Sequence, residues 1–232
     1  MSLYLLIELC SLAVPLIFSF DKKVAYYKHW KYLFPAMLIS AVFFIATDIW
    51  FTDLGVWGFN PRYHSSLLLA GLPVEEILFF FIIPYCSIFI HYVFITYFPN
   101  AILGDKTTRI VSIVIIMILS LITITNINRA YTAFFSIYLI LLMAVTLLTG
   151  STVLNRFFIS FLIILIPFFA VNGILTGSFI EEEVVWYNSM EITGVRIFTV
   201  PAEDTIYGFS MILSTLLLMD IFEKYFSSKK KI

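Results

Sequence analysis

Two pairs of adjacent carboxylates stand at the heads of long apolar stretches in this chain, and they are the residues best placed to do chemistry. The pairs are Glu75-Glu76 and Glu203-Asp204. Ionisable groups at the edge of a membrane-spanning segment are costly to hold there, so by default they indicate a functional site. Negative charge is also favourable at a helix N-terminus. That effect accounts for one carboxylate per helix better than for two that point in different directions.

Acid–base catalysis is the chemistry that such carboxyl groups favour. In an apolar cavity a carboxylic acid is stabilised in its neutral form, because desolvation disfavours the ion. Two carboxyl groups that face each other tend to hold one proton between them, which places a proton donor beside an acceptor. Adjacent residues on a helix lie about 100° apart. Within each pair we therefore expect one acid to react and the other to orient it or to bind a loop asparagine.

The two acid pairs belong to a longer repeated pattern. Each follows a Pro-x dipeptide, and Glu75 and Glu203 are 128 positions apart. The tetrapeptide Trp-Gly-Phe-Asn that ends at Asn60 corresponds, at the same offset, to the Val-Trp-Tyr-Asn that ends at Asn188. A match of this length at one offset indicates an internal duplication.

Other side chains near the acid pairs are candidates for holding the acids and a substrate. Asn60 and Asn188 can donate hydrogen bonds to a carboxylate. The rings of Phe79, Phe80 and Tyr207, one turn beyond the acids, can stabilise a developing cation through their faces. We therefore expect the four acids to be catalytic and these five residues to bind substrate.

The composition is that of an integral membrane protein. Of 232 residues, 61% are hydrophobic and 12% are charged, whereas globular domains carry about a quarter charged residues. A soluble fold cannot solvate such a surface. Cys10 and Cys86 both fall in apolar segments, which argues against a disulfide framework or a cysteine metal site. No histidine–carboxylate spacing indicates metal ligands, and we expect neither a metal nor a nucleic-acid partner.

Seven apolar segments are long enough to cross a bilayer as helices. They lie at about residues 3–20, 31–51, 68–98, 108–125, 130–149, 155–177 and 197–222. The first lacks the basic start and the small-residue cleavage site of a signal peptide, so we expect it to remain as a helix. The fold class that follows is an all-α integral membrane protein with seven transmembrane helices.

The duplication divides these helices into two parallel three-helix repeats, helices 1–3 and 5–7, with helix 4 as a linker. We expect domains at residues 1–100 and 129–232, joined by the linker at 101–128. Equivalent helices are four crossings apart, so the repeats point the same way through the membrane and are related by a pseudo-two-fold axis along its normal. The acid pairs then lie at the same depth, and they can meet if helices three and seven share a cavity.

Basic residues set the orientation, because cytoplasmic loops carry an excess of lysine and arginine. Eleven of the 14 basic residues follow segments one, three, five and seven. The other side holds Arg62, Arg129 and Arg196. We therefore expect the N-terminus outside and the C-terminus in the cytoplasm.

The motifs and the seven spans together resemble the membrane-embedded lycopene cyclases, which occur as two small subunits in some bacteria and as a fused domain in fungi and archaea. The resemblance rests on Phe59-Asn60-Pro61, on the block from Leu72 to Phe80, and on the echo from Pro201 to Gly208. It covers essentially the whole chain, which is similar to a fused form with both halves. Tyr207-Gly208 stands where the first repeat has Phe79-Phe80. We therefore expect unequal roles for the halves, for instance one acid and one base.

The resemblance implies lycopene β-cyclase activity, an isomerisation without redox change. An acid protonates the terminal double bond of lycopene, a neighbouring alkene attacks the cation, and a base removes a proton to leave a β-ionone ring; two such rings make β-carotene. The family motif falls on Glu75, Glu76, Glu203 and Asp204 as the catalytic acids.

Such chemistry needs a pocket that excludes water, but it needs no nucleotide. The chain has no Gly-x-Gly-x-x-Gly fingerprint among its nine glycines, and we expect no cofactor. The implied partners are lycopene, arriving from the bilayer between helices, and membrane lipids. The implied location is a bacterial-type cytoplasmic membrane.

Two other functions stay open at this point. One is a carotenoid hydratase on the same scaffold, in which water quenches the cation. The other is a proton-coupled transporter, which also uses paired intramembrane carboxylates on repeats. The sequence leaves undetermined which acid donates, whether one or both ends are cyclised, which ring isomer forms, and the oligomeric state. For a cyclase, we expect Glu75→Gln or Glu203→Gln to abolish cyclisation while the protein still inserts.

Overall fold

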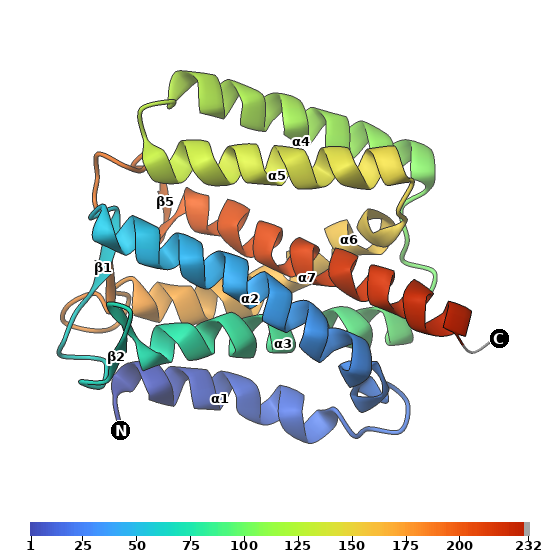
Figure 1. Cartoon of the computed structure of the whole chain (residues 1–232), viewed down its shortest axis with the longest axis horizontal. Coiled ribbons are helices and arrows are strands. Elements are labelled where there is room, and N and C mark those ends of the chain that lie inside the picture. Colours follow the sequence, from blue (N-terminus) through green and yellow to red (C-terminus); the bar gives the residue numbers. More distant parts are fainter. Residues whose placement is uncertain (230–232) are drawn as a thin grey trace.

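The computed structural model describes residues 1–229, and within them the chain folds into seven α-helices that run roughly along one direction (Figure 1). The helices are α1 (Leu3–Phe18), α2 (Trp30–Asp53), α3 (Val74–Tyr97), α4 (Asp105–Thr125), α5 (Ala130–Thr149), α6 (Val153–Leu175) and α7 (Ala202–Lys229). A short 3-10 helix, Tyr26–His29, leads into α2. The expected all-α fold with seven helices is confirmed.

Six of the helices in the described part of the chain are long and apolar enough to cross a membrane. The exception is α1, whose 16 residues rise about 24 Å, somewhat less than the ~30 Å hydrocarbon core. Its outward face is nonetheless apolar, with Val14, Ile17 and Phe18 all exposed. This helix therefore belongs with the other six in the hydrocarbon layer.

The third and seventh segments start later than the sequence predicts. Residues 68–73 form a hairpin of β2 (Leu68–Leu69) with β3 (Leu72–Pro73), and β5 (Arg196–Ile197) pairs likewise with β6 (Val200–Pro201). The apolar segments begin at about 68 and 197, but the helices begin only at Val74 and Ala202, because the backbone turns through left-handed conformations here. Ala70 has φ 51° and Phe198 has φ 57°, which a right-handed helix cannot contain. These two residues are again 128 positions apart.

The two halves meet directly in the loops at the N-terminal ends of α3 and α7. Strand β1 (Trp57–Phe59) pairs antiparallel with its own equivalent, β4 (Val185–Tyr187), and Gly58 lies opposite Trp186 at the centre. The flanking backbone bonds are reciprocal: Asn60 N donates to Val184 O, and Asn188 N donates to Val56 O, both at 2.8 Å. A pseudo-two-fold axis therefore passes through the Gly58–Trp186 pair.

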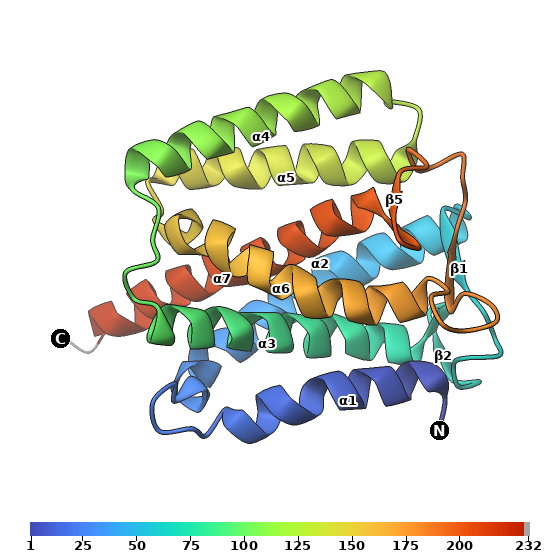
Figure 2. The ribbon, with the colours of Figure 1, turned by 180° about the vertical axis from the view of Figure 1, so that it is seen from behind.

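Helices α3 and α7 occupy the middle of the bundle (Figures 1 and 2). Within the repeats, α1 packs on α3 as α5 packs on α7; between them, α2 packs on α7 as α6 packs on α3. Helix α4 lies outside this arrangement and packs chiefly on α5. Each of these contacts in one repeat thus has an equivalent in the other, as two parallel three-helix repeats require. This packing brings the N-terminal ends of α3 and α7 toward each other.

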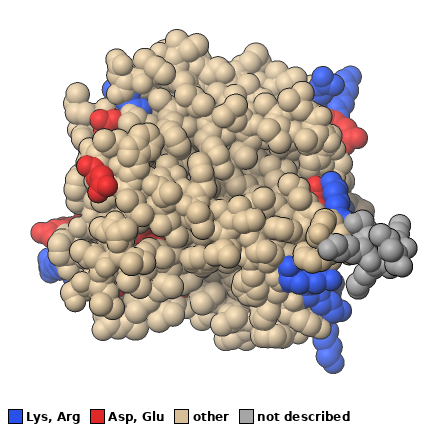
Figure 3. Space-filling view, in the orientation of Figure 1, with Lys and Arg blue, Asp and Glu red and all other residues tan. Residues whose placement is uncertain are grey.

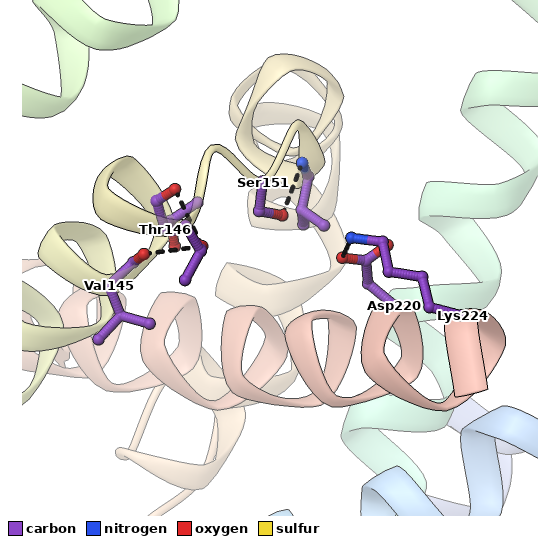
Figure 4. Close-up of polar contacts among 7 residues, drawn as sticks. Val145, Thr146, Ser151, Asp220 and Lys224 are labelled. Carbon is purple, nitrogen blue, oxygen red and sulfur yellow. Dashed lines mark hydrogen bonds and ion pairs between the residues drawn. The ribbon is translucent and has the colours of Figure 1, made fainter.

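The two ends of the bundle differ in charge. Figure 3 shows most lysine and arginine side chains at the end where the C-terminus lies. At that end Lys224 forms an ion pair with Asp220 at 2.7 Å, and Ser151 Oγ accepts from Val153 N in the turn between α5 and α6 at 3.4 Å (Figure 4). The opposite end carries the three strand pairings and the N-terminus.

Candidate active site

A pocket between the N-terminal ends of α3 and α7 and the C-terminal end of α6 brings acids from both repeats together. The cavity volume is about 60 Å³. Glu76 and Asp204 both line it, although their residues are only 8% and 5% exposed. The walls of the pocket are mainly aromatic and aliphatic: Tyr4, Trp57, Phe59, Phe79, Ile83, Tyr131, Phe168, Leu175, Val185, Tyr187, Tyr207, Met211 and Ile212.

Each of these two acids is held by a tyrosine from the first helix of its own repeat. The Tyr4 hydroxyl donates to Glu76 Oε2 at 2.6 Å, and the Tyr131 hydroxyl donates to Asp204 Oδ1 at 2.7 Å. Both tyrosines lie in the first turns of their helices, α1 and α5. The duplication has therefore preserved a tyrosine–acid contact and not only the acid motif.

Asp204 has a second donor that Glu76 lacks. The Tyr187 hydroxyl, from β4, donates to Asp204 Oδ2 at 3.0 Å, so both carboxylate oxygens of Asp204 accept a hydrogen bond. Burial, together with the charge of Asp204, raises the pKa of Tyr187 well above its usual value, so this phenol stays a donor. The other oxygen of Glu76, Oε1, accepts no hydrogen bond from the described side chains and backbone, and Glu76 lines the pocket.

Glu75 and Glu203, the first acids of the two pairs, do not line this pocket; they bind the loops ahead of their helices. Glu75 Oε1 accepts from Ser2 Oγ and from Ser65 N, both at 2.7 Å. Glu203 Oε1 accepts in the same way from Thr132 Oγ1 at 2.7 Å and from Thr193 N at 2.6 Å. Ser65 and Thr193 occupy equivalent positions in the repeats. One acid of each pair thus lines the pocket, and the other holds the adjacent loop in place through hydrogen bonds.

Asn60 and Asn188 lie in the loops, and the expectation that they hold the acid pairs is not met. Asn60 Nδ2 donates to Glu182 Oε2 at 2.9 Å, and Asn188 Nδ2 donates to Gly55 O at 3.2 Å. Each Oδ1 accepts from the backbone N–H two residues on, the turn that asparagine favours. The motif asparagines therefore shape the β1–β4 region and stay outside the pocket lining.

Of the three aromatic residues expected to contact substrate, Phe79 and Tyr207 line the pocket. Phe80 is buried elsewhere, stacked on Phe44 with ring centroids 6.4 Å apart. Its equivalent in the second repeat is Gly208, which lines the pocket against Phe168. The two repeats therefore line the pocket unequally at this position, because the second repeat lacks the bulky ring.

The aromatic walls enclose the space beside the acids. Trp57 and Tyr131 have ring centroids 4.9 Å apart, Tyr131 stacks on Tyr187 at 5.9 Å, and Trp57 lies 6.4 Å from Tyr207. Among the described residues that line the pocket, none is a lysine, arginine or histidine. A positive charge formed on a hydrocarbon here would be met by ring faces and carboxyl groups.

The structure adds pocket residues that sequence reasoning missed. Asp48 lines the pocket from α2 and is 2% exposed, and Trp57 Nε1 donates to its Oδ1 at 2.5 Å. The signal for Asp48 was available, because it is an acid inside the apolar segment 31–51. No comparable signal marked Tyr4, Tyr131 or Tyr187, because tyrosines near the ends of membrane helices are ordinary interfacial residues.

Comparison with known proteins agrees with this geometry. The family model described as Lycopene cyclase matches residues 1–94 and 128–222. These segments hold the two repeats and leave out the whole of α4. No curated protein and no solved structure gives a significant match. With both repeats matched and the acids of both facing one pocket, the chain is a single-chain integral membrane carotenoid cyclase that belongs to the lycopene cyclase family.

Proposed function

We propose that the protein converts the linear ends of lycopene into β-ionone rings, giving β-carotene, and that Glu76 and Asp204 perform the two proton transfers. The observation that carries this proposal is that the two acids come from equivalent positions of the repeats and face one aromatic pocket. Ring closure of this kind consumes one proton and releases one, so it needs an acid and a base near the same end group.

The hydrogen bonds divide the two roles. Glu76 is the acid, because Oε1 is free of hydrogen bonds and can present a proton to the pocket. Asp204 is the base, because both of its oxygens already accept from phenols, an arrangement that suits a carboxylate. Glu76 protonates the terminal double bond, the neighbouring alkene closes the ring, and Asp204 removes a proton from the cyclic cation to leave the ring double bond.

The pocket walls protect the cation between these two steps. The ring faces of Trp57, Tyr131 and Tyr207 stabilise positive charge. Unlike water, they do not attack the cation. Water at this point would give an alcohol, the product of a hydratase. The substrate is dissolved in the bilayer and reaches the pocket from the side. The basic residues at the C-terminal end support the orientation with the N-terminus outside and the C-terminus in the cytoplasm.

Expression in cells that accumulate lycopene tests the proposal directly. We expect the wild type to convert lycopene to β-carotene. Glu76→Gln and Asp204→Asn should lower conversion at least ~100-fold, the usual contribution of a general acid or base, with the protein still in the membrane. Asp53→Asn, which removes an exposed acid at the end of α2, is the matched control and should convert normally.

Glu75→Gln and Glu203→Gln complete the series. Because these side chains bind loops outside the pocket lining, we expect lower thermal stability and partial activity, rather than the complete loss that the sequence motif predicts. Pigment chromatography measures the carotenoids that each variant produces. Unchanged lycopene with the wild type, or full conversion by both Glu76→Gln and Asp204→Asn, would refute the proposal. Hydroxylated products would identify a hydratase.

A further inference from the structure

Asp48 is a third carboxyl group in the same pocket, and the two proton transfers described above do not use it. It sits in α2, five residues before the end of that helix, and is 2% exposed. Trp57 Nε1 donates to Oδ1. The other oxygen, Oδ2, is buried and has no hydrogen-bond partner among residues 1–229. Buried carboxylate oxygens are almost always hydrogen-bonded, so this atom needs a donor.

The groups around Asp48 narrow the choice of donor. Tyr4 faces the pocket from α1, Glu76 from α3, Tyr207 from α7, and Trp57 from β1. Tyr4 donates to Glu76, and Trp57 donates to the other oxygen of Asp48. Asp48 and Glu76 line the same pocket, and no lysine or arginine among the described lining residues balances them. The Tyr207 hydroxyl and a proton on Glu76 are the remaining donors among these groups. Only a proton on Glu76 would also relieve the repulsion between the two carboxyl groups.

We propose that Asp48 and Glu76 form a carboxyl pair that holds one proton, and that this pair is the acid of the cyclisation. The inference deepens the proposed function and rests on it for the identity of the substrate. Two carboxyl groups that share a site cannot both ionise cheaply, and the proton they retain belongs to the pair. Asp48 acts through Glu76, so it is a positioning residue that keeps Glu76 protonated.

The second repeat has no such pair. The position equivalent to Asp48 is Thr176, whose hydroxyl donates to Asn172 O at 2.8 Å inside α6 and contacts Thr199 Oγ1 at 2.7 Å. Asp204 is instead held at both oxygens by tyrosines. The duplication has therefore diverged into a two-carboxyl site in the first repeat and a single carboxylate in the second, which matches a division into donor and acceptor.

The proton balance closes within the pocket. The pair gives its proton to the terminal alkene, whose electrons form the new C–H bond. The neighbouring alkene then forms the ring bond, and Asp204 takes the proton released from the cyclic cation. The pair is then one proton short, and Asp204 holds one extra. Transfer of that proton from Asp204 back to the pair restores the starting state without any co-reactant.

Infrared spectroscopy of the purified full-length protein tests the pair without relying on lycopene. We expect the wild type to show a carbonyl stretching band of a protonated carboxyl group that shifts in D₂O. Glu76→Gln should remove this band and Asp48→Asn should shift it, while Asp204→Asn and the control Asp53→Asn should leave it in place. A band unchanged by Asp48→Asn would overturn the proposal.

Turnover provides the second measurement. We expect Asp48→Asn to lower the conversion of lycopene at least ~100-fold, and Asp48→Glu, which keeps the acid, to recover a substantial part of it. Equal activity of Asp48→Asn and the wild type would also overturn the proposal. If Asp48→Asn does not accumulate, Trp57→Phe replaces it: loss of the hydrogen bond to Oδ1 should shift the band, and an unshifted band counts against the pair. A normal band pattern with no cyclisation by the wild type would leave the pair standing and refute the proposed function.

Discussion

Tyr187 reaches Asp204 from a loop strand rather than from a membrane helix, and so couples the β1–β4 pairing to the proton acceptor. Its hydroxyl donates to Asp204 Oδ2, and its ring stacks on Tyr131 with an interplanar angle of 11°. Because burial and Asp204 raise the pKa of this phenol well above 10, it stays protonated across the neutral range. Its ionisation therefore contributes no pH dependence to the reaction below about pH 10.

Replacing Tyr187 with phenylalanine isolates the hydrogen bond from the stacking. Tyr187→Phe leaves one oxygen of a buried carboxylate without its donor, which costs about 1–3 kcal/mol. We expect cyclisation to slow at least ~5-fold, with the protein level unchanged. Initial rates in isolated membranes measure this. Tyr97→Phe, at the far end of α3, is the control, and equal rates for the two variants would exclude the role given to Tyr187.

Sequence reasoning found the acids at the centre of this site but not their partners. The doubled Pro-x-acid-acid motif at Glu75 and Glu203 was visible because ionisable groups are rare in apolar segments. Which acid of each pair faces the pocket depends on the rotation of α3 and α7, which packing against neighbouring helices sets. Two of the tyrosine donors, Tyr4 and Tyr131, come from helices more than 70 residues away along the chain. No local pattern records such a contact.

The antiparallel contact of β1 with β4 depends on having different residues at equivalent positions. Gly58 and Trp186 face each other across the pseudo-two-fold axis, and a Cβ atom on Gly58 would lie 2.4 Å from Trp186 Cζ2. Two tryptophans cannot occupy this crossing. The repeats therefore had to diverge here for both halves to pair closely in one chain.

Gly58→Ala tests this close approach. Overpacking of this kind costs about 1–3 kcal/mol, so we expect a lower midpoint of thermal unfolding in detergent. We also expect reduced cyclisation, because the neighbouring Trp57 holds Asp48. Gly104→Ala is the control, since a Cβ there meets nothing within 4 Å. Adding Trp186→Leu to Gly58→Ala should restore the midpoint, and failure to do so would mean that the clash is not the cause.

Hydropathy located all seven helices, but two of the apolar segments begin before their helices do. Segments beginning at Leu68 and Ile197 read as continuous with the following helices because their residues are as apolar as a membrane span. The β2–β3 turn runs through two left-handed residues, Ala70 and Gly71, and the β5–β6 turn through Phe198. Gly71 is a turn signal in the sequence, whereas Phe198 is not. The repeat supplied the missing information only once both turns were seen at the same offset.

The chain can be divided into two pieces after Asn100, so that the linker helix stays with the second repeat. Residues beyond this point bind the second repeat: Leu103 N donates to Asn155 O at 2.9 Å, and Asn155 Nδ2 donates to Asp105 Oδ1 at 2.6 Å. Helix α4 then packs on α5. The expected boundary between residues 100 and 101 stays a prediction, and these contacts assign the linker helix to the C-terminal piece.

Cutting the chain there tests whether the two repeats assemble as partners. We expect residues 1–100 and residues 101–232 to convert no lycopene when expressed separately, because Glu76 and Asp204 are then on different pieces. Expressed together they should regain conversion, through the reciprocal backbone bonds of β1 and β4. Pairing the N-terminal piece that carries Glu76→Gln with the wild-type C-terminal piece is the negative control. Activity from either piece alone would contradict a site built from both.

The shared pocket bears on how a substrate with two identical ends would be handled. The acids of both repeats, Glu76 and Asp204, line one pocket, so the duplicated fold brings one acid from each half to a single reaction site. Under the proposed function, the two ends of lycopene would react there in turn, with a one-ringed carotenoid formed between the two reactions.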